Sequence, residues 1–431
     1  MRKTTTLLGA AALCLAAAAP VPTAQAEDLH TFRKIQLTDQ FYSEGIGYAD
    51  FNKDGKTDVV YGPHWYEGPD YKTKHEIYTP KTFDPKGYAT TFFSFAYDFN
   101  NDGFADVLEL DFPGAEARWW ENPKGKDGAW TKHKVFDVVD NESPQFRDIT
   151  GDGKPEIICG SKGFLGWVEV NWNDPTKPWS FHPISPKGKW HKYTHGIGFG
   201  DVNGDGKMDY LEPDGWWEQP KEVAADGVWK FHKFKFCEGA QMFVYDVNGD
   251  GKNDVVTSLR AHGFGLAWYE QVADPKEEGG IGFKRHMFMN AQPAENKYGV
   301  KFSQLHAVDL VDIDGDGLKD IVTGKRYWAH GPKGDDEPSA PAVLYWFKLV
   351  RTGAEVDFVP YRIDDNSGVG VDVVVADLNG DKLPDVLVGN KQGAFVHIHE
   401  KKTVSKAEWE QAQPKVFEGK IKTELMEPAA K

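Results

Sequence analysis

Seven short segments of the chain set acidic side chains on alternating positions. The segment "DVNGDGKMD", which starts at Asp201, has acidic or amide side chains at positions 1, 3, 5 and 9 and a glycine at position 6. Carboxylates this close repel one another unless a cation lies among them, and Ca²⁺ takes about six to eight oxygen ligands. In a tight loop these side chains face one point, and the carbonyl of position 7, here Lys207, adds an oxygen. The segment therefore predicts a calcium loop.

The pattern occurs seven times, with starts 45 to 66 residues apart. The expected ligands are Asp50, Asn52, Asp54 and Asp58; Asp98, Asn100, Asp102 and Asp106; Asp148, Asp152 and Glu156; Asp201, Asn203, Asp205 and Asp209; Asp246, Asn248, Asp250 and Asp254; Asp312, Asp314, Asp316 and Asp320; Asp377, Asn379, Asp381 and Asp385. Thr150 replaces one ligand of the third loop and Lys382 the turn glycine of the seventh, so weaker binding is expected at both. Two alternatives are EF-hands, which the strand-like flanks disfavour, and solvated Asp-Gly turns without metal.

Each acidic loop lies within a repeat of four strand-like runs. In the fourth repeat the runs are residues 195–200, "MDYLEP", "GWWEQP" and "WKFHKFKF", separated by turn residues. Seven such repeats with almost no helical pattern predict an all-β fold, a seven-bladed β-propeller of four-stranded antiparallel blades. The last repeat has only three clear strands, so we expect residues 31–37 to supply the fourth and close the ring. The propeller would span residues 27–400, followed by a tail at 401–431.

The pattern D-x-[DN]-x-D-G-x-x-D before a strand resembles the FG-GAP/VCBS repeat family, which includes the propellers of integrin α-chains and many secreted bacterial proteins. The resemblance covers residues 31 to about 400. It implies a β-propeller with structural calcium, up to seven ions, and says little about activity.

The first 26 residues read as a secretory signal peptide. Arg2 and Lys3 precede the apolar run "LLGAAALCLAAAA", and Ala24-Gln25-Ala26 is a cleavage site, which predicts a secreted or periplasmic protein. A lipoprotein signal at Cys14 is disfavoured by the large residue before it. No other segment is apolar enough to cross a membrane. The two remaining cysteines lie in different repeats, and free thiols are favoured over a disulfide.

The formal charge is −16, and becomes −18 without Arg2 and Lys3. This acidity argues against nucleic acid and anionic membranes as partners. The seven loops hold 22 carboxylates, so the acidity is better explained by the binding of metal ions in these loops than by the recognition of a charged partner. The sequence does not set the oligomeric state.

A second set of polar residues lies at the starts of the first strands and the ends of the second strands, which meet at the face opposite the acidic loops. His195, His262 and His306 come from the fourth, fifth and sixth repeats. Three imidazoles from adjacent strands could hold Zn²⁺ or another divalent metal with an open position. His195 is the first choice for a base or a ligand.

The remaining candidate catalytic residues are Glu142 and Glu238 as alternative bases, and Arg260, Lys325 and Arg326 as a positive field for an anionic or enolate-like species. Single histidines that only bond loop carbonyls are the alternative.

Two of these segments, "HGIGFGDVNGDGKMDYLEPDGWWEQP" and "LHAVDLVDIDGDGLKDIVTGKRYWAHGP", resemble the propeller part of aldos-2-ulose dehydratases, which eliminate water from keto-sugars such as anhydrofructose. The resemblance implies a metal-assisted lyase or dehydratase acting on a keto-sugar or related carbohydrate. The alternative is a non-catalytic propeller that binds glycan or protein. A hydrolase or oxidoreductase has no supporting motif.

Overall fold

The computed structural model describes residues 26–419, apart from residues 224–226, 278 and 354, together with Met1. The predicted signal peptide lies almost wholly outside the described residues. Among the residues that are described, no helix is long and apolar enough to cross a membrane.

The chain divides into two compact units. The smaller one contains residues 1–29 and 401–413, and the larger one residues 30–400 and 414–431. In the smaller unit Lys401 pairs with Asp28 at 2.7 Å. The helix α1 (Lys406–Ala412) begins there, with the Ser405 side chain accepting the Glu408 N–H.

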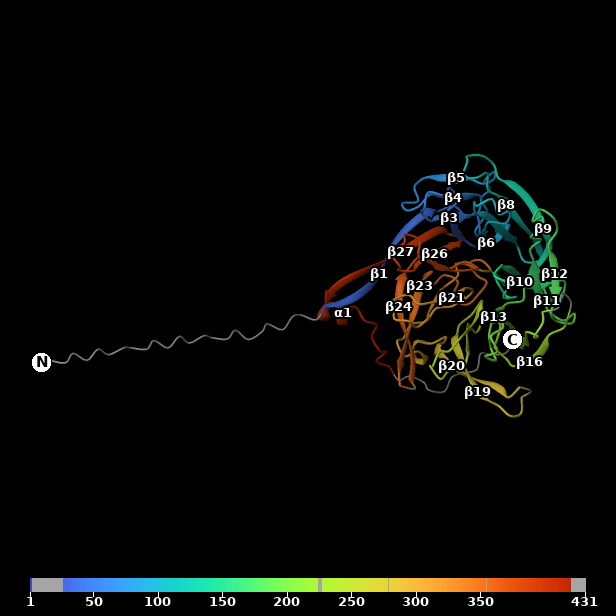
Figure 1. Cartoon of the computed structure of the whole chain (residues 1–431). Helices are drawn as coiled ribbons and strands as arrows, with labels where there is room; N and C mark the ends of the chain where they lie inside the picture. Colours follow the sequence, from blue (N-terminus) through green and yellow to red (C-terminus); the bar gives the residue numbers. More distant parts are fainter. Residues whose placement is uncertain (2–25, 224–226, 278, 354, 420–431) are drawn as a thin grey trace. The chain divides into compact units, whose positions relative to one another are not determined.

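The strands form five sheets, of four, seven, eight, four and four strands, which divide into seven groups of four, with β9 shared by the second and third groups and β1 completing the seventh (Figure 1). The groups are β2 (Gly47–Ala49), β3 (Asp58–Tyr61), β4 (His64–Tyr66) and β5 (Lys74–Glu76); β6 (Thr91–Tyr97), β7 (Asp106–Asp111), β8 (Ala115–Glu121) and β9 (Thr131–Arg147); β9, β10 (Glu156–Ser161), β11 (Phe164–Glu169) and β12 (Ser180–Pro183); β13 (Gly198–Gly200), β14 (Asp209–Glu212), β15 (Gly215–Glu218) and β16 (Lys230–Lys233); β17 (Met242–Tyr245), β18 (Asp254–Ser258), β19 (Leu266–Ala273) and β20 (Ile281–Met289); β21 (Val308–Val311), β22 (Asp320–Gly324), β23 (Leu344–Thr352) and β24 (Glu355–Asp364); β25 (Val374–Ala376), β26 (Asp385–Asn390), β27 (Gly393–Ser405) and β1 (Ala26–Thr38). A single-turn helix, η1 (Pro293–Glu295), precedes β21. The structure is therefore all-β, built of curled sheets whose strands pair antiparallel except for the parallel pair of β13 and β17.

The N-terminal strand completes the last group, as the sequence predicts. The order in that sheet is β1-β27-β26-β25, so residues 31–37 lie beside the last strand of the seventh repeat. Neighbouring groups are joined by backbone hydrogen bonds as well. Glu44 N–H donates to Thr91 O at 3.1 Å, and Val371 N–H donates to Glu44 O at 3.2 Å, which joins the first group to both the second and the seventh.

Hydrophobic cores lie between consecutive groups. Ile158 and Trp167 of the third group pack with Tyr210 and Trp217 of the fourth. Similar clusters join every other consecutive pair, including the seventh and the first, where Leu387 and others pack with residues of β3. Both faces of each small sheet are thus buried, which explains why consecutive residues of these short strands are apolar instead of alternating with polar ones.

The last acidic residue of each loop is an internal anchor. Asp209 is fully buried, and its two carboxylate oxygens accept the N–H groups of Val202 and Gln219, both at 2.9 Å. The Gln219 side chain then donates to Ile149 O in the loop of the preceding repeat at 2.7 Å. This carboxylate therefore fixes the loop to the third strand of its own repeat, and the adjoining amide fixes it to the neighbouring repeat.

Five histidines stack on the tryptophans of the third strands. The pairs are Trp65–His75, Trp119–His133, Trp167–His182, Trp216–His232 and Trp268–His286, with ring centroids 4.0–4.5 Å apart. In each pair the histidine Nε2 also lies 2.7–2.9 Å from a glutamate two residues after the tryptophan. Five of the 14 histidines thus have a structural role, repeated from group to group.

Candidate metal centre

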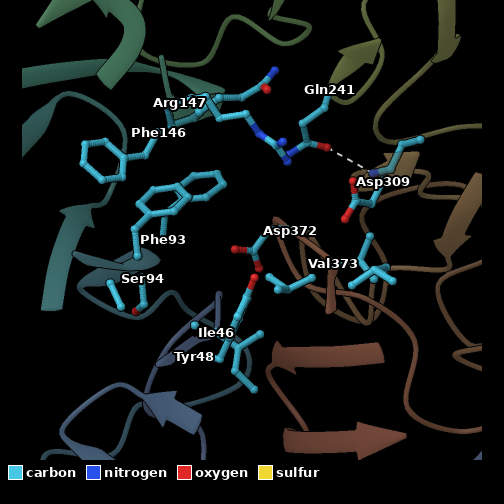
Figure 2. Close-up of a pocket in the computed structure, with 18 of the residues that line it drawn as sticks. Ile46, Tyr48, Phe93, Ser94, Phe146, Arg147, Gln241, Asp309, Asp372 and Val373 are labelled. Atoms are coloured by element: carbon cyan, nitrogen blue, oxygen red, sulfur yellow. Dashed lines mark hydrogen bonds between the residues drawn. The ribbon is translucent and has the colours of Figure 1, made fainter. Parts of the chain in front are cut away.

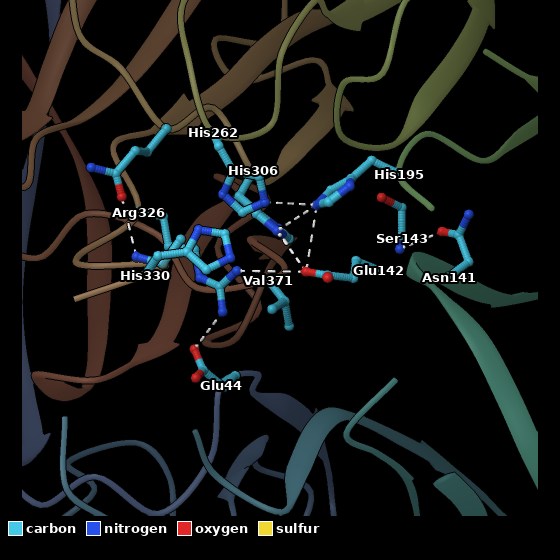
Figure 3. A network of polar contacts seen from close by, with 12 residues as sticks. Glu44, Asn141, Glu142, Ser143, His195, His262, His306, Arg326, His330 and Val371 are labelled. Carbon is cyan, nitrogen blue, oxygen red and sulfur yellow. Dashed lines mark hydrogen bonds and ion pairs between the residues drawn. The ribbon is translucent and has the colours of Figure 1, made fainter. Parts of the chain in front are cut away.

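Glu142, His195, His262 and His306 meet at one point (Figure 3). The Nε2 atom of His195 lies 3.0 Å from Nε2 of His262 and 3.3 Å from Nε2 of His306. The Glu142 Oε2 atom lies 3.1 Å from Nε2 of His306 and 3.5 Å from Nε2 of His195. One ligand atom from each of the four residues lies within 4.8 Å of all the others.

Unusual backbone conformations deliver these side chains to the cluster. Asn141, just before Glu142, has φ 84°, and Gly196, just after His195, has φ 77°. Gln304, two residues before His306, has φ 58°, and its N–H donates to Gly263 O at 2.7 Å, next to His262. Left-handed conformations at non-glycine residues are costly and persist where the surroundings impose them. They lie within two residues of three of the four cluster members, Glu142, His195 and His306.

The donor set fits a divalent transition metal. Burial lowers the pKa of His306 to about 3, and burial together with the charges of its neighbours holds the pKa of His262 well below its ordinary value. Both rings are therefore neutral. Burial alone would raise the pKa of Glu142, but hydrogen bonds with His195 and His306 lower it, so this carboxylate is ionised. Three imidazoles and one carboxylate, at mutual distances of 3.0–3.5 Å where given, match the ligand types of zinc and related metals.

A buried ion pair lies behind the cluster. Arg326 is 1% exposed and donates to Glu44 Oε2 at 2.9 Å, while its other terminal nitrogen lies 4.0 Å from Glu142 Oε2. Lys391 Nζ lies 3.8 Å from Glu44 Oε1. The Glu44 carboxylate offsets much of the Arg326 charge, so the net positive field at the cluster is smaller than the sequence suggests.

Three of the candidate residues lie outside the cluster. Arg260 is paired with Asp336 at 3.7 Å, and Glu238 is exposed, its backbone bridged to that of Arg260. Lys325 is buried, with Nζ at 3.4 Å from Arg326 O, and burial lowers its pKa to about 8. The sequence places these residues at the right strand ends but cannot tell which way their side chains turn.

The cluster opens on a cavity of about 450 Å³. Tyr88, Phe92, Phe112 and Tyr193 form an aromatic part of its wall, and Arg326 and His330 line it beside Glu142, His195 and His262. Tyr88 and Tyr193 are 37% and 45% exposed. The aromatic wall is not predicted from the sequence, although "HKYTH", just before a first strand, places Tyr193 two residues from His195.

A second cavity, of about 410 Å³, is lined by the first strands of the groups (Figure 2). Its charged residues are Arg147, Asp309 and Asp372, and burial raises the pKa of both aspartates. Gln241 in its wall is used structurally, since its side-chain oxygen accepts the Val308 N–H at 3.0 Å. The sequence does not predict this cavity.

The acidic loops differ in how well they gather their oxygens. Among the residues described, three carboxylates come within 4.8 Å of one another in the third loop and in the sixth. In the third loop the final ligand is Glu156, whose Oε2 accepts the Ile149 N–H at 3.0 Å while Oε1 lies 3.4 Å from the Thr150 hydroxyl. The longer side chain thus keeps one oxygen at the loop, although the sequence suggests a weaker site there.

The sixth loop holds a lysine among its carboxylates. Lys348 Nζ contacts Asp314 and lies 2.9 Å from Asp316. These contacts raise the pKa of Lys348 against the effect of burial. In the second repeat Glu121 occupies the equivalent place and accepts from Asn100 at 3.2 Å. Relative to the second repeat, the sixth has Asp314 in place of an asparagine and Lys348 in place of a glutamate. The two replacements are complementary, because each repeat keeps a polar contact between these two positions.

The sequence comparisons identify the repeats. Residues 98–159 and 148–211 match the model of the FG-GAP-like repeat, so this part of an all-β chain consists of FG-GAP-like repeats. No curated protein matches the sequence significantly.

Several solved structures are similar at low identity. An Agrocybe aegerita lectin that recognises non-reducing terminal N-acetylglucosamine is 17% identical, covering 78% of this chain and 81% of its own, with TM-score 0.43. The V. cholerae biofilm matrix protein Bap1 is 11% identical over 85% and 89%, with TM-score 0.40. The rhamnogalacturonan lyase YesW is 13% identical over 86% and 72%, with TM-score 0.41. Since these TM-scores are below 0.5, no function of these proteins is carried to this chain. The resemblance to aldos-2-ulose dehydratases stays a hypothesis.

Proposed function

We propose that this chain is a secreted, metal-dependent carbohydrate lyase or dehydratase that removes water from a keto-sugar in the 450 Å³ cavity. The observation that carries the proposal is the convergence of Glu142, His195, His262 and His306 on a single point, with the first three of these residues at the wall of that cavity. A cavity of this size suits a small ligand, since such sites commonly measure about 300–1,000 Å³.

The scaffold would be a seven-bladed propeller, each blade tied by a calcium loop. Two facts support the closed ring: the hydrophobic cluster between the seventh and first groups, and the Val371–Glu44 hydrogen bond. The two carboxylate-rich loops support metal binding, and calcium is the ion that this loop pattern favours.

Glu142, His195, His262 and His306 would hold a divalent transition metal, zinc being the simplest choice. Bound there, the metal would act as a Lewis acid toward the ketone oxygen of the substrate. The elimination would pass through an enolate of the substrate, formed when the carbon next to the ketone loses its proton. The aromatic wall formed by Tyr88, Phe112 and Tyr193 would shield this species from water, and the buried Arg326–Glu44 pair would hold Glu142 in place. His195 belongs to the ligand set in this scheme rather than acting as the base, because its Nε2 faces the other ligand atoms.

A non-catalytic glycan-binding function is the second candidate. The exposed rings of Tyr88 and Tyr193 favour it, since aromatic faces are suited to pack against the apolar faces of sugars. In that case the metal would only orient a bound saccharide.

The test uses the full mature chain, loaded with zinc in the presence of excess calcium, and 1,5-anhydrofructose as the keto-sugar probe. The expected result is the appearance of a conjugated enone, followed by ultraviolet absorbance and NMR, that depends on zinc. His306→Gln should abolish the reaction, while His286→Ala, at a structural Trp–His stack, should keep it. Zinc-dependent binding of the sugar without any turnover would favour the glycan-binding function. The absence of both sugar binding and turnover would refute a keto-sugar substrate.

A further inference from the structure

The proposed elimination needs a group that takes up and returns a proton, and the metal-binding side chains do not provide one. The Nε2 atoms of His195, His262 and His306 point to the shared centre, as does Glu142 Oε2. Once these atoms bind a metal, their lone pairs are used. A proton acceptor must therefore lie elsewhere on the cavity wall.

His330 has the required position. Its side chain is 52% exposed, it lines the same cavity, and its ring centroid lies 4.5 Å from that of His262 (Figure 3). Its Nδ1 lies 2.8 Å from Asp335 Oδ1. A carboxylate can only accept, so in the neutral ring Nδ1 carries the hydrogen and Nε2 keeps its lone pair.

The surroundings fix this pair in place. Asp335 has only 8% of its side chain exposed, and its Oδ2 accepts the His330 backbone N–H at 2.9 Å. The loop is held on both sides of the histidine: Lys391 Nζ donates to Trp328 O at 2.9 Å, and Ala329 N–H donates to the Gln304 side chain at 3.2 Å. A base oriented by a carboxylate on an anchored loop is a common arrangement for proton transfer.

We propose that His330 is the general base and acid of this cavity and that Asp335 orients it; the inference rests on the proposed function. His330 Nε2 takes the proton from the carbon next to the ketone, and the C–H electron pair forms the enolate double bond. The enolate electrons then re-form the ketone and expel the hydroxyl on the next carbon. The protonated His330 gives its proton to this leaving group, so the products are an enone and water and the histidine returns to its starting state.

The same residues could instead hold a second ion. His262, His330 and Asp335 have ligand atoms within 4.8 Å of one another, and His262 Nδ1 is buried without a hydrogen-bond partner among the described residues. However, this nitrogen lies 3.7 Å from Asp335 Oδ1, whereas His330 already makes a normal hydrogen bond to that oxygen. The 2.8 Å contact between His330 and Asp335 is therefore better explained by a hydrogen-bonded pair for proton transfer than by a second ion site.

The test compares the zinc-loaded full chain with His330→Ala, His330→Gln and Asp335→Asn, using 1,5-anhydrofructose at one pH. His286→Ala is the control. Enone formation and deuterium uptake at the carbon next to the ketone are measured by NMR, and bound zinc by elemental analysis. We expect both His330 variants to keep the zinc content and lose roughly 10²–10⁴-fold in kcat, as is typical for a general base. Free imidazole should restore part of the activity of His330→Ala, which a purely structural role would not allow. Asp335→Asn should lower kcat with little change in KM.

Three results would overturn the inference. Wild-type-like kcat in both His330 variants would remove His330 from the reaction and leave the proposed function standing. Loss of one zinc equivalent in His330→Ala would make His330 a ligand. A wild-type protein that neither forms enone nor exchanges deuterium would refute the proposed function, and the inference with it.

Discussion

Removing one histidine should separate metal binding from fold stability. His262 is the best position, because its side chain is 25% exposed, compared with 11% for His195 and 0% for His306. His262→Ala therefore opens the smallest void of the three. It removes the contact between the Nε2 atoms of His262 and His195, which lie 3.0 Å apart.

The expected loss of affinity can be bounded. Replacing a residue that only orients a metal ligand typically costs about 10–100-fold in affinity. Loss of one of the four converging ligand atoms should cost at least about 100-fold, or about 2.7 kcal/mol. Because a ligand that binds only the folded state stabilises it by mass action, the zinc-dependent rise in Tm should shrink accordingly. The zinc-free Tm should change little.

The assay is competition for zinc with a chromogenic chelator, with calcium kept in millimolar excess so that the acidic loops stay saturated. Thermal unfolding is recorded with and without zinc on the same samples. His286→Ala is the matched control: its ring is 30% exposed, stacks on Trp268 at 4.3 Å and lies 2.7 Å from Glu270. It should lower Tm equally with and without zinc. A His262→Ala variant that binds zinc within about threefold of the wild type would refute the metal centre.

Three further outcomes are expected. Calcium should raise Tm, and Asp205→Ala should lose more of this rise than Asp316→Ala, because Lys348 already occupies the carboxylates of the sixth loop; equal losses in calorimetry would contradict this. Burial raises the pKa of Glu212 from 4.5 to about 7, so its stabilising contribution is complete below pH 4.5 and lost as the pH rises to 7. At about 1.4 kcal/mol per pKa unit, the wild type should lose about 3 kcal/mol of unfolding free energy relative to Glu212→Gln as the pH rises between these values. Denaturant titrations measure this loss, and a difference between the two proteins that does not change with pH would disprove the prediction. His232→Ala should lower the free energy of unfolding by about 1–3 kcal/mol without changing zinc content, because it stacks on a buried tryptophan rather than binding metal; any loss of zinc would argue otherwise.

The strand order could be predicted from the sequence because it depends on short-range patterns. Each acidic loop needs a strand on either side, and its glycine marks the turn, so seven loops fix the seven groups. The pairing of residues 31–37 with β27 follows from the strand missing in the last repeat. Shared strands are less predictable. The continuous β9 serves two groups, and nothing in its sequence distinguishes it from two separate strands.

The meeting of His195, His262 and His306 could also be anticipated, since strand ends in neighbouring repeats point to the same face. The fourth member of the cluster, Glu142, was expected only as an alternative base. Its direction depends on the left-handed conformation of Asn141, which propensities do not specify. Arg260 shows the opposite error. It stands at the expected strand end, but an ion pair with Asp336 holds it outside the cluster.

The four residues of the cluster come from segments of the third to sixth repeats, so no single loop contains the site. Their relative positions depend on the bonds between repeats: Glu142 N–H donates to Thr194 O at 2.9 Å, and Gln304 N–H donates to Gly263 O at 2.7 Å. Each of these bonds links a residue at or beside one ligand to a residue beside the next. A cluster built across repeats is as rigid as their interfaces, which are apolar and buried. The extensive packing between repeats is thus a requirement of the site as well as a source of stability, because a shift of one repeat would separate atoms that now lie 3.0–3.5 Å apart.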